Sequence, residues 1–399
     1  MDTLNGRIIV LGITGSIAAY KAADVASKLT QADAQVDVVL TEAATRFITP
    51  LTLRSITRRP VYTDMFDPAS ELAVEHVELA RRADAVLVAP ATAMTIARLA
   101  HGLASDLVSL TVLATRAPVL VAPAMDSNMY ESAATQANLA VLRERGFIMV
   151  GPAEGRLASG RWGPGRLVEA EVLLGALRQV LGRRGDLAGR KLVVSAGGTR
   201  EPLDPVRFLG NYSSGKMGYA VAEAARDRGA QVTLVSAPTA LAAPYGVEVV
   251  SVQTTLEMRD AVAAACQGAD ALIMAAAPVD YRVTSPARQK VKKGDQSLAL
   301  ELVPNPDILA ELKGDFVKVG FAAESEDLVQ NAAEKLRRKG AHLFVANDIT
   351  AADAGFGADT NRVTIIDVDG GVESLPLLSK YEVAHRVLDR VAKLLQPQS

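Results

Sequence analysis

The sequence is poor in cysteine, in aromatic residues and in charge of one sign. Its 399 residues include a single cysteine, Cys266, which excludes an internal disulfide framework and thiolate metal clusters. The four histidines lack zinc-binding spacing, and the 43 Lys and Arg residues nearly balance the 45 Asp and Glu residues. Without a basic excess the chain has no overall field that attracts nucleic acid. We therefore predict neither a nucleic-acid partner nor a zinc site.

Long hydrophobic runs are also missing. No apolar stretch approaches the roughly 20 residues that a membrane-spanning helix needs, and the N-terminus enters a strand pattern without the layout of a signal peptide. The composition, 49% apolar and 22% charged, is nevertheless rich enough for compact cores. The sequence thus predicts a globular cytoplasmic protein without a membrane partner.

Short apolar runs alternate with helical patterns along the whole chain. Continuous β-branched runs are typical of strands buried on both faces, and their alternation with helices predicts parallel sheets. The expected strands are 7–11, 36–40, 85–89, 119–122, 191–195, 232–235, 271–274, 317–321, 343–346 and 362–366. The expected helices are 16–30, 132–145, 169–181, 216–229, 255–267, 326–338 and 379–395.

A glycine-rich, charged segment at 182–189 interrupts this alternation, and a new strand pattern starts after it. We therefore predict two domains, 1–185 and 190–399, each a Rossmann-like three-layer α/β domain with a mostly parallel sheet. Both open with strand, glycine turn and helix, but the motifs differ and no repeat period is present.

The first glycine turn, Gly12-Ile13-Thr14-Gly15-Ser16, lies between a strand and a helix. Small residues there let backbone N–H groups approach a phosphate, although a simple tight turn explains them equally well. The turn lacks the G-x-G-x-x-G fingerprint, which disfavours an NAD site. Thr41, Thr92 and Asp126 follow three further strands, so we expect all four loops to meet at the carboxyl edge of one sheet.

Five segments together carry a resemblance: GITGSIAAYK, HVELA, PATAMTIAR, PAMDSNMY and GRLASGRWGPGR. They resemble the flavin-dependent cysteine decarboxylases, in particular those that act on phosphopantothenoylcysteine. The resemblance implies a flavodoxin-like fold with FMN bound near Gly15, Ser16, Thr41 and Thr92. It also implies His76 as catalytic base, and trimers with active sites between subunits.

Two residues depart from that family pattern. Asp126 stands where the family has the Asn that binds the substrate carboxylate, and Ser159 stands where it has the Cys that donates the last proton. An ionised Asp126 would repel the substrate carboxylate, so a protonated Asp126 that acts as an acid is one hypothesis. The alternative is a domain that is catalytically altered or regulatory.

The second half carries the segments SAGGTREP, NYSSGKMG, AAPVDYR, NPDI, GFAAE and AND. They lack P-loop spacing and resemble phosphopantothenate cysteine ligase, which implies activation of a carboxylate by CTP. Because triphosphate chemistry needs charge neutralisation, we also expect Mg²⁺, held mostly by phosphate and water. The resemblance assigns catalysis to Asn211, Arg207 and Lys290, although a basic run such as 290–293 is usually only solvated. It assigns CTP binding to Ala276, Asp280, Asn305, Pro306, Asp307, Ile308, Phe321, Lys335 and Lys339.

The two halves fit one product flow in coenzyme A biosynthesis. The ligase joins cysteine to 4′-phosphopantothenate at the expense of CTP, and the flavoprotein decarboxylates the product to 4′-phosphopantetheine. The resemblance implies a homo-oligomer, with trimeric decarboxylase domains, dimeric ligase domains and a dodecamer as the assembly that combines them. A tandem nicotinamide oxidoreductase is a different interpretation, supported only by the two strand-glycine-helix openings.

Overall fold

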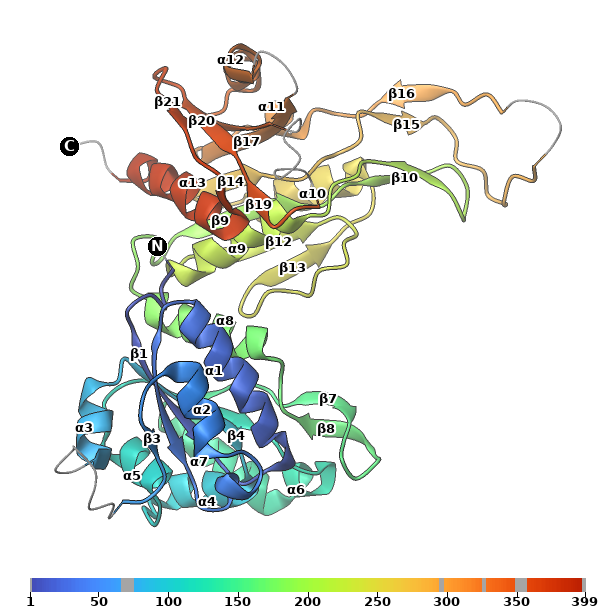
Figure 1. Cartoon of the computed structure of the whole chain (residues 1–399). Coiled ribbons are helices and arrows are strands. Elements are labelled where there is room, and N and C mark those ends of the chain that lie inside the picture. Colours follow the sequence, from blue (N-terminus) through green and yellow to red (C-terminus); the bar gives the residue numbers. More distant parts are fainter. Residues whose placement is uncertain (1, 66–74, 294–297, 325–327, 349–356, 397–399) are drawn as a thin grey trace. The chain divides into compact units, whose positions relative to one another are not determined.

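The computed structural model describes residues 2–65, 75–293, 298–324, 328–348 and 357–396. The chain divides into two compact units, Asp2–Leu181 and Gly182–Ser399. Each unit is a three-layer α/β domain, which confirms the predicted fold class (Figure 1). Among the helices that are described, none combines the length and the apolar character that crossing a membrane demands.

The first unit is built on a six-stranded parallel sheet in the order β3-β2-β1-β4-β5-β6. Without the two-residue edge strand β3, this order is the 2-1-3-4-5 arrangement of flavodoxin-like folds. The strands are β1 (Ile8–Ile13), β2 (Gln35–Leu40), β3 (Val61–Tyr62), β4 (Ala85–Ala91), β5 (Val119–Pro123) and β6 (Ile148–Met149).

Helices cover both faces of this sheet because its strands are apolar on both sides. Val10, Val88 and Val121 pack into one core cluster with α3 (Glu75–Arg82), α4 (Ala93–His101), α5 (Leu107–Ala114) and α7 (Ala133–Glu144). By strand alternation, the fully buried Ile9 and Leu11 face the opposite side. The remaining helices of the unit are α1 (Lys21–Gln31), α2 (Pro50–Thr57), α6 (Ser127–Glu131) and α8 (Ala170–Gly182).

The second unit has an eight-stranded sheet in the order β13-β12-β9-β14-β17-β18-β20-β21. Six strands are parallel, whereas β20 and β21 are antiparallel additions at one edge. The strands are β9 (Lys191–Ala196), β12 (Gln231–Ser236), β13 (Glu248–Ser251), β14 (Ala271–Met274), β17 (Val317–Glu324), β18 (Leu343–Asp348), β20 (Val363–Asp367) and β21 (Val372–Ser374).

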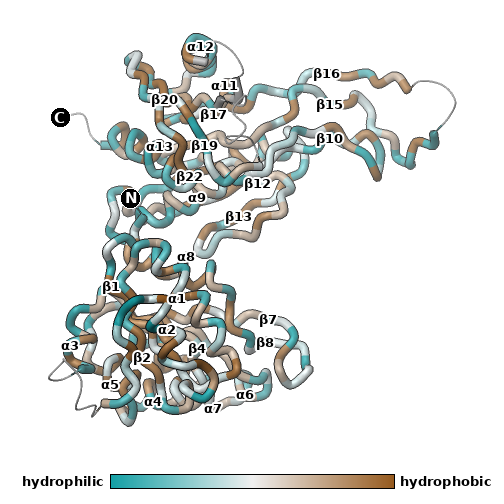
Figure 2. Tube along the Cα trace, viewed as in Figure 1, coloured by the Kyte–Doolittle hydropathy of each residue, from teal (hydrophilic) through white to brown (hydrophobic). Residues whose placement is uncertain are grey.

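Two core clusters sandwich this sheet. Val194 and Ile273 pack on the side of α9 (Lys216–Asp227) and α13 (Lys380–Leu394), whereas Val193 and Leu272 pack on the side of α10 (Thr255–Ala265), α11 (Ile308–Glu311) and α12 (Leu328–Lys339). Figure 2 shows the hydrophobic stretches lying largely within each unit, with hydrophilic residues toward the outside. The alternation within each strand therefore produces a sheet with both faces covered.

Short hairpins project from the two sheets. In the first unit, β7 (Ala153–Arg156) pairs with β8 (Trp162–Arg166). In the second, β10 (Arg200–Pro202) pairs with β11 (Phe208–Gly210), β15 (Tyr281–Val283) pairs with β16 (Leu302–Pro304), and β10 contacts β15. These last two hairpins form an arm that extends away from the sheet (Figure 1). A fourth pair, β19 (Thr360–Asn361) and β22 (Leu378–Ser379), leads into α13.

Most predicted elements are present, with shifted ends. The helix expected from Ser16 starts as a short 3-10 helix, η1 (Ile17–Tyr20), and continues as α1, with Ser16 as the N-cap of η1. A second 3-10 helix, η2 (Ala44–Arg46), follows β2. The predicted start of α12 at residue 326 lies outside the described residues.

Candidate functional sites at the carboxyl edges of the two sheets

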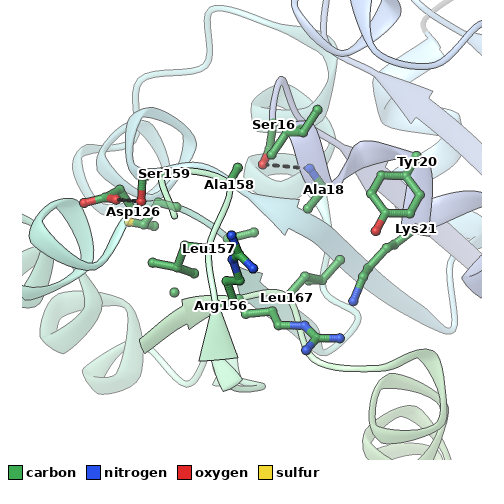
Figure 3. A pocket seen from close by; sticks show the side chains of 15 residues that line it. Ser16, Ala18, Tyr20, Lys21, Asp126, Arg156, Leu157, Ala158, Ser159 and Leu167 are labelled. Atoms are coloured by element: carbon green, nitrogen blue, oxygen red, sulfur yellow. Dashed lines mark hydrogen bonds between the residues drawn. The ribbon is translucent and has the colours of Figure 1, made fainter. Parts of the chain in front are cut away.

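A cavity of about 460 Å³ opens at the carboxyl edge of the first sheet. Its walls come from the loop after β1, the loop after β5 and the β7–β8 hairpin. In Figure 3, Asp126 and Ser159 lie on one side of the cavity, Tyr20 and Lys21 on the other, and Arg156 between them. The lining residues are Ser16, Ile17, Ala18, Tyr20, Lys21, Ala124, Met125, Asp126, Arg156, Leu157, Ala158, Ser159, Gly165, Arg166 and Leu167.

The two departures from the family pattern meet in one hydrogen bond. Ser159 Oγ donates to Asp126 Oδ2 at 2.7 Å, and the Asn128 amide donates to Asp126 Oδ1 at 3.0 Å, which caps α6. The Ser159 hydroxyl and then the Asn128 amide hold the pKa of the Asp126 carboxyl below its usual value. These contacts favour an ionised Asp126, and they argue against the hypothesis that this carboxyl is a protonated acid.

Of the four residues expected near FMN, Ser16 lines this cavity, whereas Gly15, Thr41 and Thr92 lie on the loops after β1, β2 and β4 and are not among its lining residues. Ser16 Oγ accepts from the Ala18 amide at 3.2 Å, and Thr92 caps α4 by accepting from the Thr95 amide. Thr14 Oγ1 donates to Pro90 O and accepts from the Thr92 amide, which ties the loops after β1 and β4 together. A Cβ on Gly15 would lie 2.4 Å from Ala43 Cβ, so only glycine fits against the loop after β2. That loop begins with Thr41, whose hydroxyl accepts from Ala44.

His76 stands apart from this group. It lies half-buried on α3 and is not among the residues that line the cavity of its own chain. Sequence reasoning missed the β7–β8 hairpin and the cationic wall made by Lys21, Arg156 and Arg166. The two arginines lie within the GRLASGRWGPGR segment, but its glycines and proline give no strand periodicity.

A second cavity of about 440 Å³ lies at the carboxyl edge of the second sheet, and a smaller one of about 170 Å³ adjoins it through shared residues. Ala276, Pro278, Asp280, Phe321, Lys339 and Phe344 line both. The smaller cavity adds the loop before α11, including Asn305, Pro306, Asp307 and Ile308, and the larger adds Asn211 and Lys335. All nine residues expected to bind CTP therefore lie around these two adjoining cavities.

The larger cavity is strongly cationic. Among its described lining residues, four are lysines and Asp280 is the sole acidic side chain. Lys335 and Lys339 are four residues apart on α12, and Lys339 Nζ lies 3.3 Å from Asp307 Oδ2. The buried Oδ1 of Asn347, on the same wall, has no hydrogen-bond partner among the described residues. Such a wall suits a polyphosphate with a hydrogen-bonding nucleobase.

Lys216 and Lys380 also line this cavity and were not predicted. Lys216 Nζ donates at 2.7 Å to both Gly357 O and Asp359 Oδ1, and Lys380 Nζ donates to Ala358 O. Burial and then the Lys216 ammonium lower the pKa of Lys380. These lysines are 164 positions apart in the sequence, so no spacing rule could have paired them.

The three predicted catalytic residues of the second unit lie in different parts of it. Asn211 lines the cavity and donates from Nδ2 to Ala277 O and Pro278 O at 3.1 and 3.2 Å. Arg207 and Lys290 do not line it; both lie on the arm, with exposed side chains. Neither Arg207 nor Lys290 is therefore part of the cavity walls of its own chain.

The described residues offer neither a group of metal ligands nor a reactive thiol. In the described parts of the chain, no three His, Cys, Asp or Glu side chains are grouped to hold a metal ion. Burial raises the pKa of Cys266 to about 11, so this thiol is a poor nucleophile.

The two units match two known protein families. The Flavoprotein family matches residues 2–182, and the DNA/pantothenate metabolism flavoprotein C-terminal domain matches residues 187–395. Among solved structures, the chain is similar to the C-terminal domain of a coenzyme A biosynthesis bifunctional protein CoaBC, at 40% identity over 54% of this chain and 100% of that chain, with a TM-score of 0.47. It is also similar to a PPC decarboxylase mutant complexed with pantothenoylaminoethenethiol, at 30% identity over 44% of this chain and 97% of that one, with a TM-score of 0.40.

The chain is also similar to curated proteins over almost its whole length. The chain is 44% identical to the coenzyme A biosynthesis bifunctional protein CoaBC of Vibrio parahaemolyticus, over 99% of this chain and 100% of the relative. It is also 44% identical to the CoaBC proteins of Bacillus subtilis, over 98% of each, and of Escherichia coli K12, over 98% of this chain and 97% of the relative. The chain belongs to the CoaBC family of bifunctional coenzyme A biosynthesis enzymes, with an N-terminal decarboxylase domain and a C-terminal ligase domain.

Proposed function

We propose that the second unit uses CTP to ligate cysteine to 4′-phosphopantothenate. The observation that supports this most is the pair of adjoining cavities around which every residue expected to bind CTP lies. The four lysines of the larger cavity supply charge for a triphosphate, and the loop at residues 305–308 supplies polar groups for the nucleoside. Mg²⁺ would be held mainly by phosphate oxygens and water, since triphosphate chemistry needs charge neutralisation.

The ligation proceeds in two balanced steps. The substrate carboxylate attacks the α-phosphorus of CTP, the bond to the β-phosphate oxygen breaks, and pyrophosphate leaves. The cysteine amine then attacks the activated carbonyl carbon, CMP leaves, and the amine loses a proton. Asn211 fixes the loop at residues 275–278 through its two amide hydrogen bonds, so this cavity wall holds its shape while the intermediate forms.

The test is to withhold cysteine. With phosphopantothenate, CTP and Mg²⁺ alone, we expect pyrophosphate and a phosphopantothenoyl-cytidylate visible by mass spectrometry. Replacing Lys335 and Lys339 together by alanine should raise the KM for CTP at least about tenfold, because two charge-assisted contacts are lost. Formation of the ligated product without any pyrophosphate would refute the cytidylate route.

For the first unit we propose FMN-dependent decarboxylation of phosphopantothenoylcysteine. Ser16 and Ala18 line the cavity together with Lys21 and Arg156, and the closely packed Gly15 precedes them, which suits the phosphate end of a flavin nucleotide. Bound flavin supplies an electron sink, by oxidising the substrate thiol so that the carboxylate can leave as CO₂. His76 is proposed as base, acting in the cavity of a neighbouring subunit, since it does not line its own.

A second candidate for this unit is a flavoprotein domain that is catalytically altered or regulatory. The ionised Asp126, held by Ser159 and Asn128, favours it, because a fixed negative charge in the cavity opposes a substrate carboxylate. Mass spectrometry separates these possibilities: phosphopantetheine indicates full turnover, whereas accumulated enethiol indicates an altered domain. A protein that binds FMN but leaves phosphopantothenoylcysteine unconverted would fit a disabled or regulatory domain.

We further propose that the first unit assembles into a homo-oligomer, with three copies as the expected number. Large apolar side chains that line or neighbour its cavity are exposed, namely Ile17 (60%), Tyr20 (62%), Met129 (50%) and Trp162 (78%). Exposed apolar residues gathered near a cavity are typical of contact surfaces. Light scattering should give a mass that is a multiple of the 42.0 kDa chain, and Trp162→Arg should reduce it.

A further inference from the structure

The turn between β10 and β11 is organised around one buried carboxylate, Asp204. Its Oδ1 accepts the amides of Val206 and Arg207, both at 2.8 Å, and its Oδ2 accepts Arg207 Nε at 3.1 Å and Nη2 at 2.6 Å. The Asp204 side chain is fully buried although the Arg207 side chain beside it is 46% exposed. Arg207 and then the amide of Val206 hold the pKa of Asp204 well below its usual range.

The same carboxylate reaches a segment more than 80 residues further along the chain. Asp204 Oδ2 accepts the Val291 amide at 3.1 Å, and Arg207 Nη2 donates to Val291 O at 2.8 Å. The Ala287 amide donates to Leu203 O at 2.9 Å. Both backbone polar groups of Val291 are thus attached to the β10–β11 turn, with a second anchor four residues earlier. Lys290 lies between these anchors.

These hydrogen bonds hold a part of the arm that has no regular secondary structure. Residues 284–293 contain no helix or strand, so the segment that carries Lys290 has no secondary structure to hold it. The Asp204 carboxylate has about four acceptor sites, and five donor groups converge on it. It therefore couples the Arg207 guanidinium and the backbone beside Lys290 in one rigid group.

We propose that Asp204 is a positioning residue for the ligase. It touches neither cavity, and it acts by holding Arg207 and the Lys290 segment at a fixed separation, so that both cations meet the anionic substrates together. The proposal rests on the proposed ligase function, in which Arg207 and Lys290 serve the reaction. Fixed geometry matters there because displacing a reacting or stabilising group by about 1 Å can cost roughly 10²-fold in rate.

The test compares Asp204→Asn with Asp260→Asn in the full-length protein. Asparagine keeps the size of the Asp204 side chain but loses the ion pair and places an NH₂ group against other donors. Asp260 lies on α10, pairs with Arg259, is 67% exposed and lines neither cavity, so its variant is the matched control. Three quantities are measured: pyrophosphate release, CTP affinity and the rate of tryptic cleavage within residues 288–293.

For Asp204→Asn we expect a fall in kcat of roughly 10- to 100-fold, cleavage at least about tenfold faster, and CTP affinity within about twofold of wild type. Asp260→Asn should match wild type in all three, and Asp204→Glu should recover part of the kcat. Unchanged cleavage of Asp204→Asn would overturn the proposal, as would unchanged kcat. Cleavage does not depend on chemistry, so a wild-type protein that releases no pyrophosphate would refute the ligase function separately. Retained CTP affinity shows that the variant is folded.

Discussion

At the scale of single residues, a hydrogen bond joins Ser159 and Asp126, the two departures from the family pattern, at the first cavity. Both residues were singled out from the sequence, but their contact could not be predicted, because Ser159 lies 33 residues from Asp126 and reaches it only through the β7–β8 hairpin. An ionised Asp126 would repel a substrate that itself carries a carboxylate.

Replacing Asp126 by asparagine should lower the KM for phosphopantothenoylcysteine by about three- to tenfold, because the like-charge repulsion disappears. The pKa of Asp126 is held below its ordinary value of 3.8, so its charge is constant between pH 5 and pH 8. The KM ratio between the two proteins should therefore stay the same across this range. A ratio that shrinks toward 1 as the pH falls to 5 would show that Asp126 takes up a proton there.

Cys266 gives a second prediction at this scale. With a pKa of about 11, roughly one thiol in 10³ is ionised at pH 8, so alkylation of the native protein should be far slower than that of the unfolded chain. Cys266→Ser should keep both activities, because this residue lines neither main cavity. Intact-mass spectrometry after iodoacetamide treatment measures the alkylation rate of Cys266. Complete labelling of folded protein within minutes would contradict the assigned burial.

At the scale of elements, the sequence predicted strands better than it predicted the walls of the sites. The run at 271–274 matches β14, and 119–122 matches most of β5, since short continuous apolar runs are typical of strands buried on both faces. The pattern gave no sign of β7–β8 or the arm hairpins, because short antiparallel pairs rely on backbone bonds more than on apolar alternation. It also could not show that β20 is antiparallel.

A substitution at Gly15 tests how closely the loops after β1 and β2 must approach each other. Gly15→Ala would bring its Cβ within 2.4 Å of Ala43 Cβ, so the loops after β1 and β2 must separate. We expect most bound flavin to be lost, measured as absorbance near 450 nm per chain, with little change in the pyrophosphate release of the second unit. Adding Ala43→Gly should restore much of the flavin. If the double variant binds no more flavin than the single one, the steric explanation is wrong.

At the scale of the whole molecule, the division of the chain decides which part carries which reaction. The boundary between the two units lies at Leu181 and Gly182, so the segment 182–189 belongs to the second unit rather than to a free linker. Leu187 is fully buried there, and Asp186 pairs with the largely buried Arg228, which also lies 2.8 Å from Asp389. A glycine-rich charged sequence gave no sign of this anchoring, because it depends on one leucine and on a partner 42 residues away.

A fragment of residues 182–399 should therefore fold and retain ligation, whereas one of residues 190–399 should be less stable. Loss of the Leu187 contacts alone should lower the free energy of unfolding by about 2 kcal/mol. Urea denaturation of the two fragments measures the difference. Equal midpoints would show that the segment is a linker after all.

The most direct test of the central claim is to incubate the intact protein with 4′-phosphopantothenate, cysteine, CTP and Mg²⁺ and to follow the products by mass spectrometry. We predict one pyrophosphate per ligation, transient phosphopantothenoylcysteine and then phosphopantetheine, from a protein that is yellow with bound FMN. The absence of both pyrophosphate and ligated product under these conditions would contradict the claim that this chain carries out the two reactions in sequence.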